Sequence, residues 1–176
     1  MAPDPTIFGE PSRGPFRLAE YDPSWPARFS AHATRLRSAL GDVALRIEHI
    51  GSTAVPGLAA KPIVDILVVV ADPEAPSLAE PLRGAGYELR VVEPGHRMFR
   101  TPSRDVHVHL WADGAAAQDY LRLRELLRRD AAARAEYEAL KRSLAARDWP
   151  SMDDYAEAKG PLIRSLLARA PRPTRP

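Results

Sequence analysis

Three apolar patterns in the first part of the chain predict a helix that is followed by two strands. Apolar residues at spacings near four and seven predict a first helix over 26–40, with Gly41 as its stop. Alternating residues over 43–50 predict a strand. The nearly continuous β-branched run IVDILVVV, at 63–70, predicts a central strand that is covered on both faces.

The middle of the chain predicts a connecting helix and an extension of the sheet. Leu78 and Leu82 lie within a predicted helix over Pro73 to Gly86. The runs YELRVVE, HRMFRTP and DVHVHLW follow, with Gly, Pro and Ser between them. Short strands separated by such turn residues are most simply an antiparallel addition to the sheet.

Beyond Asp113 the composition changes to Ala, Leu, Arg and Glu, which favours helices. Three helices are predicted, over 115–129, 131–146 and 152–168. Asp130 and Ser151 are candidate N-caps. Gly160 and Pro161 should kink or split the last helix.

This order of elements predicts an α/β (α+β) fold, in which a mixed β-sheet with flanking helices precedes a C-terminal helical region. The prolines gather at both ends of the chain, so both ends are expected to be disordered tails. The domain prediction is a tail over 1–15, an α/β core over 16–113, a helical region over 114–170 packed on the core, and a tail over 171–176.

The amino-acid composition limits the candidate metal ligands and the classes of binding partner. The chain has no cysteine, so His, Asp and Glu are the candidate metal ligands. A net charge of +2 is too small to predict nucleic-acid or membrane binding from bulk charge. The N-terminus resembles no signal peptide, and the expectation is a cytoplasmic protein with a small-molecule or nucleotide ligand.

Asp65 is a carboxylate inside the apolar run IVDILVVV. An ionised carboxylate in a buried strand is costly unless it is paired, hydrogen-bonded or bound to a metal. We therefore expect a partner for Asp65. The alternative is that Asp65 lies at a strand end and caps a loop.

Alternation in DVHVHLW places Asp105, His107, His109 and Trp111 on one face of a strand. Two histidines about 7 Å apart on one side of a strand suit one shared metal or anion, and the alternative is a polar solvent face. If this strand neighbours the one carrying Asp65, a carboxylate and two imidazoles converge. Asp65, His107 and His109 are therefore the candidate catalytic and metal-binding residues, for Mg, Mn or Zn.

The turn after the first predicted strand suits phosphate. Gly51, Ser52 and Thr53 offer a flexible backbone, N–H groups and two hydroxyls. With Lys61, they are the candidate phosphate- or nucleotide-binding residues. His49, on the apolar face of that strand, is expected to be a core histidine with one hydrogen bond.

Two lysines fall on the apolar stripes of the C-terminal helices. Lys141 shares a stripe with Tyr137, and Lys159 lies on the stripe of the last helix. One alternative is that both lysines extend to solvent. The other is that they face a cleft and, with Arg97 and Arg124, bind an anionic substrate.

Several separated blocks together resemble the GrpB family, from about Phe16 to Ala170: YDPSWP, IEHIGSTAVPGLAAKPIVDILV, HVHLW and the terminal Tyr/Lys helices. That family is similar to the nucleotidyltransferase superfamily, whose signature is a Gly-Ser turn, a strand with two carboxylates and a third carboxylate on a later strand. The resemblance implies a nucleotidyltransferase-like fold, with Gly51 and Ser52 in the phosphate-holding turn and Asp65 as the first metal carboxylate.

The chain departs from that signature at Leu67, which occupies the second carboxylate position, and the third falls near His107 or His109. Three outcomes stay open: one divalent ion held by Asp65 and a histidine, histidines that act without metal, or a site without catalysis.

The resemblance implies an enzyme that transfers a nucleoside monophosphate to a small anionic substrate, or activates that substrate with ATP. A divalent metal and a nucleoside triphosphate would then be its cofactor and co-substrate. The alternatives are a nucleotide- or metabolite-binding module and a metal-dependent phosphohydrolase.

Overall fold

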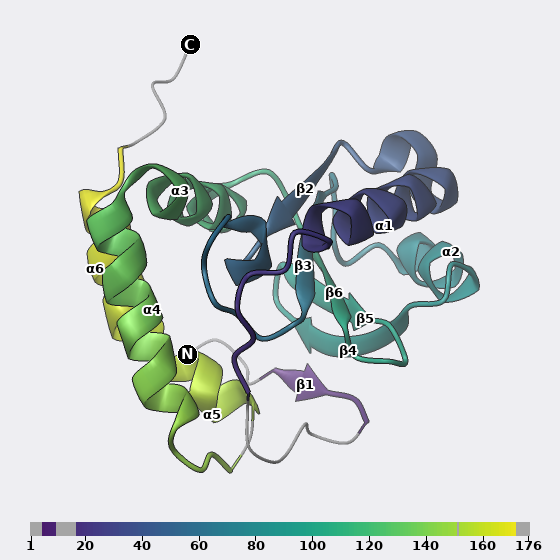
Figure 1. The fold of residues 1–176 in the computed structure, drawn as a ribbon. Helices are drawn as coiled ribbons and strands as arrows, with labels where there is room; N and C mark the ends of the chain where they lie inside the picture. Colours follow the sequence, from purple (N-terminus) through teal and green to yellow (C-terminus); the bar gives the residue numbers. More distant parts are fainter. Residues whose placement is uncertain (1–4, 10–16, 151, 172–176) are drawn as a thin grey trace.

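A six-stranded mixed sheet forms the centre of the molecule (Figure 1). The structure is a computed structural model of the 176-residue chain that describes residues 5–9, 17–150 and 152–171. The strands are β1 Thr6–Ile7, β2 Arg46–Ile50, β3 Val64–Val69, β4 Glu88–Glu93, β5 His96–Arg100 and β6 Val106–Trp111. They lie in the order β1-β4-β5-β6-β3-β2. β3 and β6 are parallel, and the other four neighbouring pairs are antiparallel.

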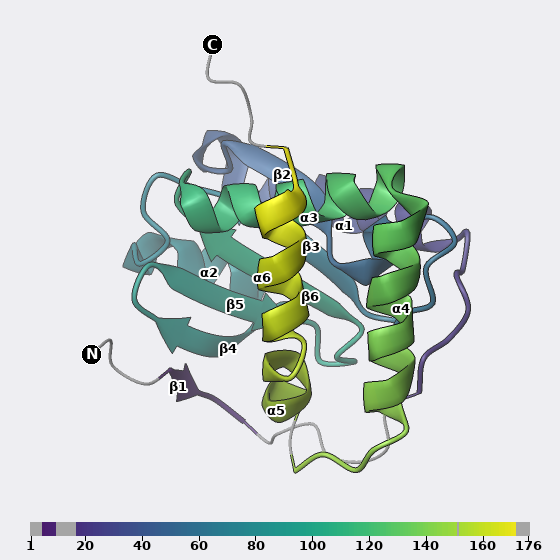
Figure 2. The ribbon, with the colours of Figure 1, turned by 90° about the vertical axis from the view of Figure 1, so that its left-hand side faces the viewer.

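Helices cover both faces of this sheet. The helices are α1 Trp25–Leu40, α2 Ala79–Gly84, α3 Ala115–Arg129, α4 Ala131–Ala145, α5 Met152–Glu157 and α6 Gly160–Arg169. Figure 1 shows α1 and α2 on one side of the sheet, and Figure 2 shows α3, α4 and α6 in front of the other side. The predicted fold class, a mixed sheet with flanking helices and a C-terminal helical region, is confirmed.

The two faces of the sheet have different cores, because successive residues of a strand point to opposite sides. Ile66 and Val68 of β3 pack in the large core beneath α1 and α2, which also holds Val108 of β6. Leu67 and Val69 face the other way and pack against Ala117 of α3. The predicted alternation of β6 is confirmed, and its histidines share the α3 side with Asp65.

The C-terminal helices agree with the pattern of the sequence. α3 has the predicted bounds, and the helix expected over 152–168 is split into α5 and α6, with Pro161 in the first turn of α6. Asp130 caps α4 as predicted, since its carboxylate accepts hydrogen bonds from the backbone N–H groups of Ala132 at 2.9 Å and Ala133 at 3.0 Å. The other predicted cap, Ser151, lies outside the described residues.

Two predicted elements are shorter than expected. The strand predicted over 43–50 begins at Arg46, because Gly41–Val43 form a 3₁₀ turn. The helix predicted over 73–86 was wrong in length, since a 3₁₀ turn begins at Pro76 and α2 covers only Ala79–Gly84. A proline cannot donate a helical hydrogen bond, so the three prolines of this segment restrict the regular helix to a part where Pro81 falls in its first turn.

The sheet extends into the segment that was expected to be an N-terminal tail. β1 pairs antiparallel with β4, and Arg90 of β4 donates hydrogen bonds to the backbone carbonyls of Phe8 and, at 2.8 Å, Gly9. An edge strand offers unpaired backbone groups, and β1 satisfies some of those on β4. The remaining parts of the two predicted tails, 1–4, 10–15 and 172–176, lie outside the described residues.

Among the helices of the described residues, none has both the length and the apolarity that crossing a membrane requires.

Candidate functional site

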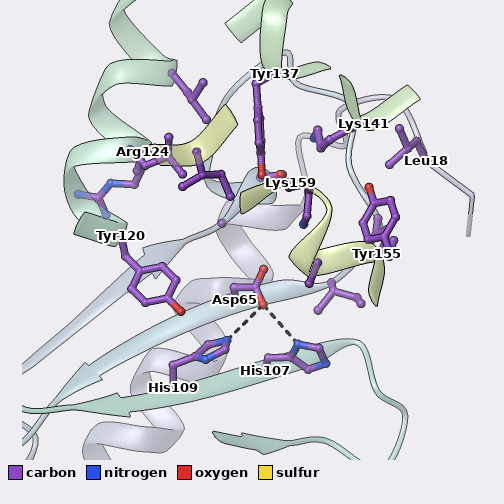
Figure 3. A pocket seen from close by; sticks show the side chains of 18 of the residues that line it. Leu18, Asp65, His107, His109, Tyr120, Arg124, Tyr137, Lys141, Tyr155 and Lys159 are labelled. Atoms are coloured by element: carbon purple, nitrogen blue, oxygen red, sulfur yellow. Dashed lines mark ion pairs between the residues drawn. The ribbon is translucent and has the colours of Figure 1, made fainter. Parts of the chain in front are cut away.

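The candidate site lies at the N-terminal end of β3, where Asp65 is the second residue of the strand. Its side chain faces the C-terminal helices and is 28% exposed, so it borders a cavity instead of lying in a packed core. The parallel pairing of β3 with β6 places Asp65 opposite His107, and His109 is two residues further along the same face. The predicted convergence of these three side chains is therefore present (Figure 3).

Both imidazoles approach the same carboxylate oxygen. His107 Nδ1 lies 3.4 Å from Asp65 Oδ1, and His109 Nε2 lies 3.6 Å from it. One donor atom from each of the three residues lies within 4.8 Å of the others. Burial by itself raises the pKa of a carboxyl, but the two imidazoles outweigh this effect and hold the pKa of Asp65 well below its usual range.

These three residues fit a divalent cation. In a tetrahedral centre with metal–ligand bonds of about 2.05 Å, neighbouring donors lie roughly 3.3 Å apart, close to the separations of Asp65 Oδ1 from His107 and His109. Two imidazoles and one carboxylate suit zinc and similar transition metals, whereas magnesium prefers oxygen ligands. Of the ions predicted, zinc fits this donor set best.

Gly51 leaves the space that this carboxylate occupies. A Cβ at position 51 would lie 2.4 Å from Asp65 Oδ2, and the backbone φ of Gly51 is +71°. Only glycine combines this conformation with so close an approach. Gly51 and Ser52 both line the cavity, next to Asp65.

Thr53, one of the predicted phosphate-binding residues, follows the cavity-lining Ser52 in the chain, but its hydroxyl is engaged within the protein. It is buried beside the cavity, where its hydroxyl donates a 3.1 Å hydrogen bond to the carbonyl of Ile63 and lies 3.0 Å from His49 Nε2. His49 stacks on Phe29 with ring centroids 4.8 Å apart, and burial lowers its pKa to about 4. His49 is thus the core histidine that the sequence predicted.

Three lysines from separate elements border the cavity. Lys61 precedes β3, Lys141 belongs to α4, and Lys159 lies just before α6. The Lys61 ammonium lies 3.4 Å from the centroid of the Tyr155 ring, and that of Lys159 lies 4.8 Å from it. Lys141 is 2% exposed and donates a hydrogen bond to the carbonyl of Ala59.

Burial strongly affects these ammonium groups. Burial, together with the positive charge of Lys159, lowers the pKa of Lys61 and of Lys141 to about 7. Burial also lowers the pKa of Lys159, against the opposing effect of Tyr155. Buried like charges of this kind create a strong local preference for an anion.

The two predicted arginines differ from the lysines. Arg124 lines the cavity, but its guanidinium is held by Glu48 at 2.9 Å and by the carbonyl of His49 at 2.8 Å, so it ties α3 to β2. Arg97 is not brought to the cavity, because it points to the opposite face of the sheet and pairs with Glu74 at 2.9 Å. Its position in β5, one residue from a residue that faces the cavity, explains the difference.

Sequence reasoning did not single out His96 and Glu93, which form a series of contacts that leads away from His109. His96 Nε2 lies 3.2 Å from His109 Nδ1, and His96 Nδ1 lies 2.5 Å from Glu93 Oε1. Burial lowers the pKa of His96 to about 4. The strand alternation of HRMFRTP places His96 on one face with Met98, but its contact with His109 depends on the register between β5 and β6.

The cavity that these residues enclose has a volume of about 350 Å³. This is within the range of pockets that bind small molecules. Figure 3 shows Asp65 and the two imidazoles on one side of the cavity, and Lys141, Lys159 and Tyr155 on the other. The site can therefore hold a cation and an anionic group side by side.

The fold and the site define a class of protein with a mixed sheet and a carboxylate–imidazole pocket beneath lysine-bearing helices. The chain belongs to the GrpB family, since residues 15–169 match the family described as GrpB protein. A UPF0157 protein of Streptomyces coelicolor is 50% identical over 93% of this chain and 89% of its own length.

One solved structure agrees with this assignment. The crystal structure of the conserved protein GrpB from Enterococcus faecalis has a TM-score of 0.73 and 34% identity, and the match covers 87% of this chain and 98% of that one. A cytoplasmic RNA terminal U-transferase has a TM-score of 0.44 and 16% identity over 71% of this chain and 42% of its own. A likeness as distant as the second does not establish a shared activity.

Proposed function

We propose that this chain is a metal-dependent enzyme of the nucleotidyltransferase type, which transfers a nucleoside monophosphate from a nucleoside triphosphate to a small anionic acceptor. The observation that carries the proposal is the convergence of Asp65, His107 and His109 opposite three lysines in one cavity. A metal triphosphate presents a cation and several negative charges within a few ångströms, which matches this arrangement.

Each group then has a role. Asp65, His107 and His109 would hold a divalent ion, which supplies Lewis-acid stabilisation of charge on the transferred phosphate. Lys61, Lys141 and Lys159 would bind the phosphate oxygens and neutralise the charge that develops on the leaving group.

The proposed reaction is a displacement at the α-phosphorus of the nucleoside triphosphate. An acceptor oxygen attacks the α-phosphorus, the bond from that phosphorus to the oxygen bridging to the β-phosphate breaks, and pyrophosphate leaves with the electron pair. The acceptor proton passes to solvent. The turn at Gly51 and Ser52 lies beside Asp65, where its backbone N–H groups would orient phosphate oxygens.

Calorimetry and product analysis test this proposal. The full chain is titrated with ATP, GTP, CTP and UTP in the presence of Mg²⁺, Mn²⁺ or Zn²⁺, and pyrophosphate release is followed with mixtures of anionic metabolites as acceptors. We expect one nucleotide to bind with a metal, D65N to abolish turnover, and K159M to weaken nucleotide binding roughly tenfold. Binding of no nucleotide with any of the ions would overturn the proposal.

An exposed charge elsewhere provides the matched control. Arg83 of α2 pairs with Glu80 on the far side of the sheet, so R83M removes one positive charge without touching the cavity. R83M should bind nucleotide as the wild type does. Equal losses in K159M and R83M would indicate only a bulk-charge effect.

A second candidate function rests on Leu67. This residue occupies the second carboxylate position of the superfamily signature, and its fully buried side chain packs beneath α3, where it cannot bind a metal. A nucleotide- or metabolite-binding module without catalysis would bind the same ligand with no pyrophosphate release, and D65N would then leave nucleotide affinity nearly unchanged. Phosphate release without an acceptor would instead indicate a phosphohydrolase.

A further inference from the structure

A chain of polar contacts runs from the β4–β5 turn to Asp65. Glu93 ends β4 and His96 begins β5, and their side chains meet at 2.5 Å between Glu93 Oε1 and His96 Nδ1. The second nitrogen of His96, Nε2, lies 3.2 Å from His109 Nδ1. The second nitrogen of His109 then lies 3.6 Å from Asp65 Oδ1.

The imidazole of His96 is held firmly in this position. The residue is 5% exposed, and its ring stacks on Trp111 with centroids 4.3 Å apart and planes 13° apart. Arg97 Nη1 donates hydrogen bonds to the backbone carbonyls of Glu93 at 2.7 Å and His96 at 2.8 Å, which fixes the turn between the two strands.

The order of donors and acceptors in the series Glu93–His96–His109 decides which nitrogen of His109 carries a proton. The Glu93 carboxylate is an acceptor, so His96 donates to it from Nδ1. A buried neutral imidazole then has a lone pair on Nε2, which accepts a hydrogen bond from His109 Nδ1–H. His109 is left with a lone pair on Nε2, and this lone pair faces the oxygen of Asp65.

In this tautomer His109 no longer donates to Asp65, and a cation between His109 Nε2 and Asp65 Oδ1 satisfies both acceptors. We propose that Glu93 and His96 are positioning residues for the metal centre, which fix His109 as the Nδ1–H tautomer so that its Nε2 binds an imidazole-preferring divalent ion such as Zn²⁺. This inference rests on the metal site of the proposed function and extends it to residues that touch neither metal nor substrate.

The same arrangement gives the metal preference a physical basis. A histidine that binds a metal donates its other N–H to an outer partner, and such partners orient the ring and raise its basicity. With His109 locked in this tautomer, the site offers two nitrogens and one oxygen. The chain should therefore bind Zn²⁺ more tightly than Mg²⁺ in the absence of any nucleotide.

The experiment measures metal affinity of the metal-stripped full chain by calorimetry, without nucleotide. H96F keeps a flat ring against Trp111 but removes the acceptor for His109, and we expect Zn²⁺ affinity to fall 10- to 100-fold. H96Q restores a polar acceptor and should recover part of the loss. H32F is the matched control, because His32 of α1 contacts Tyr87 at 2.7 Å on the other side of the sheet.

A spectroscopic readout separates positioning from mere structural damage. Nitrogen NMR of histidine-labelled protein should show His109 protonated at Nδ1 in the wild type and in H32F, and this preference should be lost in H96F although thermal unfolding shows that the variant is folded. Equal Zn²⁺ affinity in the wild type and H96F would overturn the inference, as would an Nε2–H tautomer of His109 in the wild type.

Failure of the proposed function gives a different result. If the wild type binds Zn²⁺ and H96F binds it more weakly, but neither turns over any nucleotide, the positioning role stands and the transferase proposal falls. If the wild type binds no Zn²⁺, the metal centre is absent and the positioning role falls with it.

Discussion

Gly51 has two separate reasons to be glycine at the scale of a single residue. Its backbone φ is +71°, and a Cβ there would meet Asp65 Oδ2 at 2.4 Å. Gly57 has a φ of +77° but nothing within 4 Å of such a Cβ. A side chain at either position would therefore be strained by the positive φ, and only at Gly51 would it also clash with a neighbouring residue.

This pair predicts different costs for the same substitution. G57A should lower the free energy of unfolding by about 1 kcal/mol, whereas G51A should lower it by about 3 kcal/mol and displace the Asp65 carboxylate. Urea denaturation measures the first effect and Zn²⁺ titration the second. Equal destabilisation of G51A and G57A would show that the turn moves away from Asp65 without cost.

Single residues also show where sequence reasoning reached the site and where it failed. The charge of Asp65 in an apolar run was sufficient to single it out, because burying an unpartnered carboxylate is costly anywhere. Arg97 carried the same kind of signal, yet it lies on the opposite face and pairs with Glu74. A charge on a strand shows only that a partner exists, and the direction of the side chain selects that partner.

At the scale of elements, α4 carries Lys141 into the cavity, and its start depends on one side chain. Asp130 accepts hydrogen bonds from two backbone N–H groups of the first turn. D130A should lower the free energy of unfolding by about 1 kcal/mol, and D130N should have little effect because an amide oxygen still accepts. Urea midpoints at an unchanged slope measure both, and an equal loss in both variants would contradict the capping role.

Element patterns were predictable to different degrees. The alternation in β6 fixed its two faces correctly, because period 2 is a local property of any strand. The helix over 73–86 was predicted too long, since its leucines carry a helical spacing but its prolines limit the hydrogen bonds. The short β1 had no recognisable pattern, and it forms because β4 offers an open edge.

At the scale of the whole molecule, the cavity gathers three lysines from both sides of the boundary between the sheet and the C-terminal helices. Lys61 precedes β3, whereas Lys141 and Lys159 come from the helical region. The unfolded chain holds lysine protons up to a pKa near 10.5, and the folded chain loses those of Lys61 and Lys141 near 7. The unfolded state therefore binds more protons between these values, and stability rises with pH across this window.

Binding of a polyanion should show the reverse dependence on pH. Inorganic tripolyphosphate, used without metal, should raise the melting temperature of the whole chain and bind roughly tenfold more tightly at pH 6.5 than at pH 8.5, because the lysines are protonated at the lower pH. The double variant K61M/K141M is the control, because it lacks both lysines and any pH dependence that it keeps comes from protonation of tripolyphosphate itself. The same pH dependence in the variant would contradict a role for these two lysines.

The sequence by itself determined most element types, the two faces of β6 and the cap and break of the C-terminal helices, and it singled out Asp65, His107 and His109 as candidates. These properties follow from local spacing and from the cost of burying charge. The tertiary structure alone decided that β3 and β6 run parallel in a register that brings the three residues together, and that β5 places His96 behind His109. Register depends on pairing between distant segments, and no local pattern contains it.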